Sequence, residues 1–337
     1  MSTVRTLFAA AMAAILISHL PVLAGDTLVF DGGDGPGKGK HIVLLAGDEE
    51  YRSEEALPML GRILSVRHGF KCTVLFSVDP ETGVIDPVNQ TNIPGMSVLG
   101  SADMVVMLWR FRELPDSEMR HFVDFLKEGK PVLGLRTSTH AFSYERNKQS
   151  VYADYDWRSK SWPGGFGQQV LGDTWINHHG DHGSESTRGV IESGKVGHPI
   201  LRGVSDIWGA TDVYGLAHLP AEAEVLVRGA VLAGMTPDSK PVEGRKNDPM
   251  VPIVWVKDYQ VAGGKTGKAI CSTFGSAVDF QCEDARRMVV NACYWALGLE
   301  GELPARANVN YVGKYEPTFF GFGKFRTGVK PLDWRLP

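Results

Sequence analysis

Residues 178–185 concentrate the side chains that bind metal ions. His178, His179 and His182 share this short segment with two carboxylates and two glycines, which would let a loop fold back on itself. Imidazole nitrogens and carboxylate oxygens are ligands that Zn²⁺ or Mn²⁺ takes from proteins. We therefore expect the three histidines to hold one divalent ion. The alternative is that they form hydrogen bonds within a buried loop or to a sugar.

A second chemical cluster, residues 48–52, directly follows the first apolar run. Ligands of open α/β sheets bind at the carboxyl ends of strands, and acids placed there can move protons. Glu49 and Glu50 are therefore candidate catalytic residues. The alternative is that these acids only face the positive end of the following helix. The candidate substrate-binding residues, here and around the histidine segment, are Asp48, Tyr51, Arg52, Trp175 and Arg188.

Four further residues complete the candidate catalytic set. Arg136 and His140 lie in the turn after the fourth apolar run, where a cation can stabilise developing negative charge and an imidazole can act as a base. His140 could equally be a metal ligand or a buried polar residue. Asp212 and Tyr214 are two residues apart in a strand-like segment, so they point to the same face.

The elements that position these residues alternate between strands and helices. Continuous apolar runs predict strands covered on both faces at 42–46, 72–77, 104–109, 131–135, 253–256 and 269–274. Helical periodicity predicts helices at 57–66, 117–128 and 283–297, with Pro58 indicating a late start or a bend in the first. This alternation predicts an α/β fold of the flavodoxin-like type, a three-layer sandwich around a central, mostly parallel sheet.

The remaining segments surround this domain. Residues 1–24 have one charge and an apolar run, which predicts a signal peptide, with a retained anchor as the alternative. Residues 25–39 form a glycine-rich leader, 141–224 a loop-rich insertion, and 301–337 an aromatic tail that we expect to pack on the core. The predicted protein is exported, periplasmic or secreted, with no membrane contact after signal cleavage.

Composition excludes several partners. The net charge is −4 and no basic cluster is present, so nucleic acid is not expected. A glycine-rich phosphate-loop spacing ends in Gly39, where Ser or Thr is required, so we expect no nucleotide cofactor. The four cysteines form no C-x-x-C pair, and Cys72 and Cys271 lie in apolar runs typical of buried free thiols.

Two motifs carry a family resemblance. Gly197-His198-Pro199-Ile200 precedes Asp212 and Tyr214-Gly215, and a late helix contains Asn291-Ala292-Cys293-Tyr294-Trp295-Ala296. Over residues 40–300 this pattern resembles the trehalose utilisation (ThuA-like) family, which is similar in fold to class I glutamine amidotransferases. The leader, the histidine segment and the tail resemble its exported subgroup. Arg136 replaces a histidine of the cytoplasmic members, and residues 275–279 replace their Gly-His-Glu.

The resemblance implies a sugar substrate. A carbonyl at carbon 3 of a glycoside would acidify the neighbouring C–H, which makes isomerisation, elimination or hydrolysis feasible with Glu49, Glu50 or His140 as base. No cysteine nucleophile stands in the turn at 134–140, so glutaminase activity is not expected. The alternative function is a non-catalytic sugar-binding or scaffold protein that uses its tryptophans. The sequence does not indicate an oligomeric state.

Overall fold

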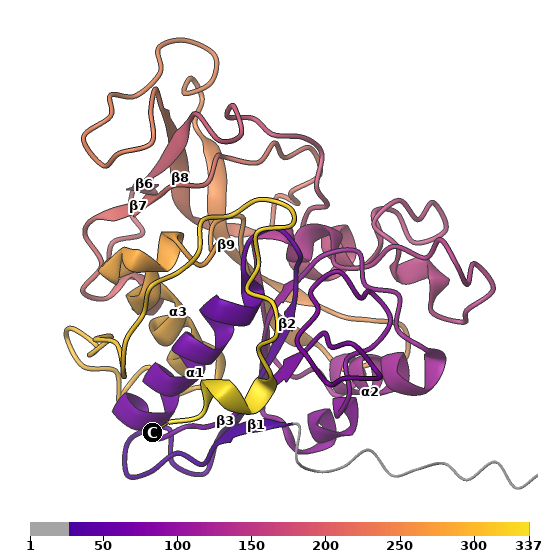
Figure 1. Cartoon of the computed structure of the whole chain (residues 1–337). Helices are drawn as coiled ribbons and strands as arrows, with labels where there is room; N and C mark the ends of the chain where they lie inside the picture. The colour runs from indigo at the N-terminus through magenta and orange to yellow at the C-terminus, as the bar shows by residue number, and fades with distance from the viewer. Residues whose placement is uncertain (1–26, 337) are drawn as a thin grey trace, which may run out of the picture.

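A computed structural model describes residues 27–336, so the predicted signal peptide lies outside the described residues. Ten strands form one sheet in the order β1-β3-β2-β4-β5-β10-β9-β8-β6-β7 (Figure 1). The strands are β1 (Leu28–Phe30), β2 (His41–Gly47), β3 (Lys71–Phe76), β4 (Met104–Trp109), β5 (Val132–Leu135), β6 (Ser186–Ile191), β7 (Ile207–Gly209), β8 (Glu224–Leu232), β9 (Val251–Tyr259) and β10 (Gly267–Ser272). All six predicted strands are confirmed.

Strands β3, β2, β4, β5 and β10 run parallel to one another and form the parallel half of the sheet. At its outer edge β1 pairs antiparallel with β3. Every residue of β2 and β4 is buried, as expected for strands covered on both faces. Alternate residues of β2 enter two separate core clusters: Ile42 and Leu44 join the first, Val43 and Leu45 the second. The chain therefore has an α/β fold with a mixed sheet.

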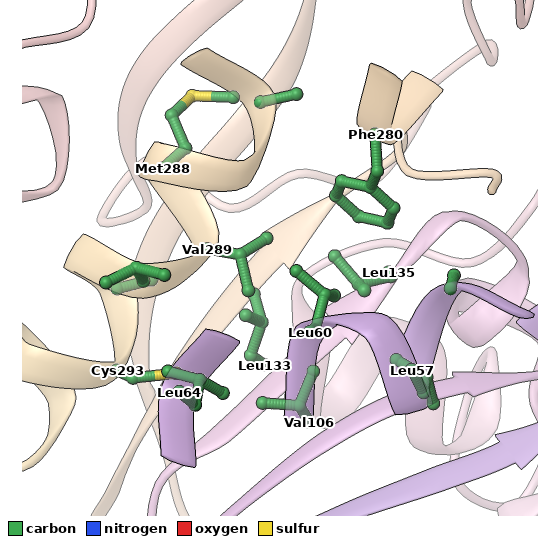
Figure 2. Packing of buried hydrophobic residues seen from close by; sticks show 14 of the residues in the cluster. Leu57, Leu60, Leu64, Val106, Leu133, Leu135, Phe280, Met288, Val289 and Cys293 are labelled. Atoms are coloured by element: carbon green, nitrogen blue, oxygen red, sulfur yellow. The ribbon is translucent and has the colours of Figure 1, made fainter. Parts of the chain in front are cut away.

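Three helices cover these faces. Helices α1 (Ser53–His68) and α3 (Glu283–Ala296) contribute to the first cluster and α2 (Asp116–Lys127) to the second. Figure 2 shows Leu60 of α1 and Val289 of α3 packing together near Leu133 of β5. The late start suggested by Pro58 is wrong: α1 begins at Ser53, and Pro58 stands inside it. The almost complete burial of the first half of α1 explains why packing overrides the local cost of proline.

Strands β9, β8, β6 and β7 form the antiparallel half of the sheet. The sequence prediction missed β1, β6, β7 and β8, of which β6 and β7 lie within the insertion 141–224. Strand β6 mixes polar and apolar residues because part of it faces solvent, with Val190 37% exposed. A half-exposed strand lacks the continuous apolar run by which the buried strands were found.

The tail returns from the end of α3 along α1 (Figure 1). Tyr311 and Tyr315 pack against the first core cluster, and Nε of Arg62 in α1 donates to the carbonyl of Trp334 at 3.1 Å. Cys72, Cys271, Cys282 and Cys293 carry free thiols. Within residues 27–336, no helix combines the length and apolar character needed to cross a membrane.

Candidate functional site

The carboxyl ends of three parallel strands meet at one edge of the sheet. Residues 48–52 follow β2, 110–112 follow β4 and 136–140 follow β5. Two segments of the insertion reach the same edge: a β-bridge joins His178 to Tyr214, and Asp212 contacts Arg136. The polar segments that the sequence singled out therefore converge, although up to about 160 residues separate them.

Asp212 is the centre of the cluster. Nδ1 of His178 lies 2.7 Å from its Oδ2, and Nδ1 of His182 lies 3.0 Å from its Oδ1. Arg136 donates to the same carboxylate at 2.8 Å. Burial alone would raise the pKa of Asp212, but Arg136 and the two histidine hydrogen bonds outweigh it and hold that pKa well below its usual range. Since an ionised carboxylate only accepts, each Nδ1 donates its proton to Asp212 in this arrangement.

His178, His182 and Asp212 offer one donor atom each within 4.8 Å of one another. Two imidazoles and a carboxylate are a donor set that suits a divalent transition-metal ion. The structure does not bring His179 into this group, because its Nε2 lies 2.8 Å from the carbonyl oxygen of Lys246. The geometry therefore selects two of the three predicted histidines and adds Asp212.

Glu50 faces the histidine pair from the β2 side. Its Oε1 lies 3.4 Å from Nε2 of His182, and its Oε2 lies 3.8 Å from Nε of Arg110. Burial, followed by the charge of Asp48, raises the pKa of Glu50, while the charges of Arg110, His182 and Arg136 oppose the shift. A carboxylate with a raised pKa, beside the two histidines and Asp212, is suited to accept and return a proton.

Glu49 has a different environment. Its carboxylate forms ion pairs with Arg110 and with fully buried Arg112, the latter at 3.2 Å. Arg112 also donates to the carbonyl oxygens of Pro87 and Asn89. Burial and the charge of Asp48 raise the pKa of Glu49 against these arginines. Glu49 thus joins β2 to the loop after β4.

Arg136 is fully buried, so it acts within the protein and does not reach the surface of the site. It has a positive φ of 42°, and its guanidinium donates to the carbonyls of Asp212 and Thr273. The guanidinium carbon lies 4.7 Å from the ring centroid of Tyr51 and 3.7 Å from that of Tyr214. Arg136 therefore fixes Asp212 and both phenols in place.

Both phenols are also buried, and their hydroxyl oxygens lie 3.4 Å apart. Burial raises the pKa of Tyr51 and of Tyr214 above the ordinary value of 10, against the opposing charge of Arg136. Both groups thus stay protonated and can donate a hydrogen bond.

His140 is buried among aromatic rings. Its ring centroid lies 5.2 Å from that of Phe111, 5.5 Å from Trp175 and 6.1 Å from Tyr214. Burial lowers the pKa of His140 well below its ordinary value, and the charges of Arg110 and Arg136 add to this, so the imidazole is neutral. Phe111, Trp157 and Trp175 are half-buried and form what we call the aromatic wall.

Three of the predicted substrate-binding residues do not contact the cluster around Asp212. Asp48 and Arg52 are buried and contact other parts of the protein, and the partners of Arg188 lie outside the cluster. Buried Asp48 accepts from the backbone of Glu50 and Tyr51 and from Thr137, which orders the turn after β2. Buried Arg52 donates to carbonyls of the tail. Arg188, which lies on β6, forms an ion pair with exposed Asp206 and donates to the carbonyl of Pro237.

Sequence reasoning missed two parts of the site. Arg110, Phe111 and Arg112 follow a predicted strand directly, so the rule that located residues 48–52 would also have located them. Phe320 of the tail lies 5.5 Å from the ring of Tyr51 and 5.3 Å from that of His182. No local signal distinguishes Phe320 from the other aromatic residues of the tail.

No family model and no curated protein matches the chain. Among solved structures, it is similar to a ThuA-like protein from Parabacteroides merdae, with 14% sequence identity and a TM-score of 0.49, covering 88% of this chain and 99% of that one. It is also similar to a ThuA-like protein from Bacteroides uniformis, with 12% identity and a TM-score of 0.46, covering 79% of this chain and 94% of that one.

Proposed function

We propose that this chain is an exported, ThuA-like carbohydrate-active enzyme that uses acid/base chemistry assisted by one divalent metal ion. Its substrates are glycosides or 3-keto sugars, and its reaction is an isomerisation, elimination or hydrolysis. The observation that carries the proposal is the convergence of Glu50 with His178, His182 and Asp212 at one edge of the sheet. The finer fold assignment that we infer is the flavodoxin-like, three-layer arrangement of class I amidotransferases, without their glutaminase activity.

Charge balance supports an uncharged, hydroxyl-rich ligand. Asp212 is paired with Arg136, and Glu49 is paired with Arg110 and Arg112. The charged groups thus largely neutralise one another, which disfavours a strongly ionic ligand. Sugars combine hydroxyl groups with apolar ring faces, and the aromatic wall supplies a matching apolar surface beside the polar cluster.

Each residue has a distinct role in this proposal. Glu50 removes a proton from the carbon next to the sugar carbonyl and returns it to the product or the leaving group. Neutral His140 and protonated Tyr214 supply hydrogen bonds at the floor of the site, and Arg136 and Tyr51 position Asp212 and Tyr214. Asp212 and the two histidines would hold the ion, which when bound polarises an oxygen of the substrate.

The alternative, a non-catalytic sugar-binding protein, is favoured by one observation. Trp157 and Trp175 are half-buried, with ring centroids 6.0 Å apart, and could stack on a pyranose ring without any chemistry. The two functions predict different responses to substitution. An enzyme loses turnover in Glu50→Gln and keeps sugar affinity, whereas a binding protein loses affinity in Trp175→Ala and has no turnover to lose.

The first experiment is a measurement of metal content in the purified protein by mass spectrometry, for the unmodified chain and three variants. We expect about one ion of Zn²⁺ or Mn²⁺ per chain, lost in His182→Ala and in Asp212→Asn. His179→Ala is the matched control, because His179 is a neighbouring histidine outside the converging group, and it should retain the ion. Equal metal loss in all three variants, or no metal in any sample, would refute the metal site.

A further inference from the structure

Residues 318–322 of the tail, which we call the strap, are held at the edge of the site by buried charged groups. Glu55 of α1 accepts from the backbone N–H of Thr318 at 2.6 Å and from its hydroxyl at 2.8 Å. Arg52 donates to the carbonyls of Phe319 and Gly321. The backbone N–H of Gly321 donates to the carbonyl of Glu50 at 2.8 Å. The strap is therefore attached to the same turn that carries the proposed base.

The strap presents two exposed rings while its backbone is fixed. Phe320 is 3% exposed and packs on Tyr51 and His182, whereas Phe319 is 45% and Phe322 59% exposed. Gly321 has a φ of 129°, a backbone conformation that glycine tolerates and other residues rarely adopt. Phe320 packs on the buried phenol of Tyr51, and Phe319 stacks on Phe320 with ring centroids 4.3 Å apart. Closure of the core needs only Phe320, so it does not explain why the outer faces of Phe319 and Phe322 remain exposed.

These rings extend the aromatic wall around the polar cluster. The ring of Phe322 lies 5.0 Å from the guanidinium carbon of Arg110, which lies 4.4 Å from the ring of Phe111 in the wall. At the other end of the wall, a chain of neighbouring rings leads from Trp175 to the strap. The ring centroids of Trp175 and His178 lie 5.7 Å apart, those of His178 and His182 4.8 Å apart, and those of His182 and Phe320 5.3 Å apart. The aromatic wall and the strap thus flank the histidine pair and Glu50 from two sides.

Two aromatic surfaces on either side of one reacting cluster fit a ligand with two apolar faces separated by a polar bond. Phe319 stacks on Phe320 and Phe322 lies on Arg110, but a single sugar ring bound over Glu50 and held by the wall would leave the exposed faces of Phe319 and Phe322 uncovered. Exposed apolar rings held in a fixed position are a common feature of recognition surfaces. Because Arg110 is already paired with Glu49, it presents its planar face between Phe111 and Phe322 and does not attract an anion.

We propose that the strap forms a second sugar-binding subsite, in which Phe322 and Phe319 contact one ring of a two-ring glycoside while the aromatic wall contacts the other. The bond between the two rings then lies over Glu50 and the histidine pair. This inference rests on the proposed function and specifies where its substrate binds. It assigns to the tail a role in selecting substrates by the number of sugar rings.

The test compares affinities for one-ring and two-ring probes by isothermal titration calorimetry on the full mature protein. The probes are glucose and methyl glucoside on one side, and cellobiose, maltose and trehalose on the other. We expect at least one disaccharide to bind more tightly than the one-ring probes. Phe322→Ala and the double variant Phe319→Ala/Phe322→Ala should reduce this preference about tenfold, and Phe322→Tyr should retain it.

Leu332→Ala is the matched control, since Leu332 is also an exposed apolar residue of the tail, 38% exposed, in the turn of residues 331–334. It should leave the preference unchanged. A loss of preference in Leu332→Ala equal to that in Phe322→Ala would overturn the subsite. The subsite would also be overturned if Phe322→Ala lost the same affinity for one-ring and two-ring probes, or lost affinity for neither. In both cases the proposed function would stand. If the unmodified protein binds none of the sugars, both proposals fail.

Discussion

The parallel and antiparallel halves of the sheet contribute to the site in different ways. The parallel half supplies residues at its strand ends, Glu49, Glu50, Arg110 and Arg136, which are fixed by strands buried on both faces. The antiparallel half and its connections supply His178, His182, Asp212 and Tyr214, and both histidines are about one-third exposed. The parallel half thus provides a fixed set of ion pairs, and the antiparallel half provides the two histidines that solvent can reach.

The two halves are linked by the contact between Arg136 and Asp212, whose side chains are both fully buried. Folding therefore has to bring together a strand end and an insertion before the site exists. The comparison suggests that the buried strands of the parallel half contribute stability, whereas the junction at their ends contributes both stability and activity. Five substitutions test this division.

The largest effect is expected for Glu50→Gln, which removes the proposed base and preserves its shape. Turnover should fall about 10²- to 10⁴-fold, with unchanged metal content and thermal midpoint. Because burial raises the pKa of Glu50, the unmodified enzyme should lose activity on acidification with a midpoint above the ordinary value of 4.5. Turnover of the disaccharide probes against pH provides the measurement, and an acid limb unchanged in Glu50→Gln would count against this role.

Arg136→Met breaks the junction. It leaves Asp212 buried without its cationic partner, which should cost about 3–5 kcal/mol in the free energy of unfolding by urea. Arg188→Met is the control, because its partner Asp206 is 73% exposed, and such pairs contribute about 0–1 kcal/mol. Similar losses of unfolding free energy in Arg136→Met and Arg188→Met would show that the junction contributes no more to stability than an exposed ion pair.

Ile42→Ala tests the parallel half alone. Ile42 is fully buried in β2, and removing its methyl groups should cost about 2–5 kcal/mol through lost burial and the cavity that remains. The ratio kcat/KM should stay unchanged at temperatures where the variant is folded. A loss of activity in the folded variant would mean that stability and activity are not divided between the two regions.

Glu54→Gln tests a buried carboxyl group next to the strap. Both carboxyl oxygens of Glu54 lack hydrogen-bond partners, and burial raises its pKa to about 8, against the nearby charge of Arg52. An acid with a raised folded-state pKa contributes stability below its unfolded value of 4.5, and this contribution is lost as the pH rises through about 8. Between pH 5 and 9 the unmodified protein should lose about 4 kcal/mol in the free energy of unfolding relative to Glu54→Gln. Parallel stability curves would contradict this assignment.

The smallest effect is expected for Val190→Ala on β6. Val190 is 37% exposed, so its loss should change the free energy of unfolding by less than about 0.5 kcal/mol. The difference in the free energy of unfolding between Val190→Ala and Ile42→Ala then compares the two halves directly. A cost above 2 kcal/mol would place Val190 in an interface that this chain forms with a partner.

Much of the fold could be predicted because burial on both faces leaves a simple pattern in the sequence. The runs at 42–46 and 104–109 consist of apolar residues, and both became central strands. Strands β6 and β7 could not be predicted in this way, since Arg188 and Trp208 face partly outward and interrupt any apolar pattern.

The candidate site was predictable by residue type and only partly by arrangement. The rule that strand ends carry function located Glu50 and Arg136, and the density of imidazoles located His178 and His182. Spacing could not separate His179 from its neighbours, because backbone hydrogen bonds to Val213 fix the direction of this loop and turn His179 toward Lys246. The roles of Asp48 and Arg52 were equally hidden, since most of their partners are backbone groups.

The sequence by itself determined which chemical groups the protein has and where the strands buried on both faces lie, because hydrophobic patterning and strand-end position are local properties. Only the tertiary structure decided which groups meet. Asp212 joins Arg136 and two histidines, and Phe320 reaches Tyr51 from the far end of the chain. Such contacts depend on the packing of segments distant in sequence, and packing is a property of the whole fold that no local pattern encodes.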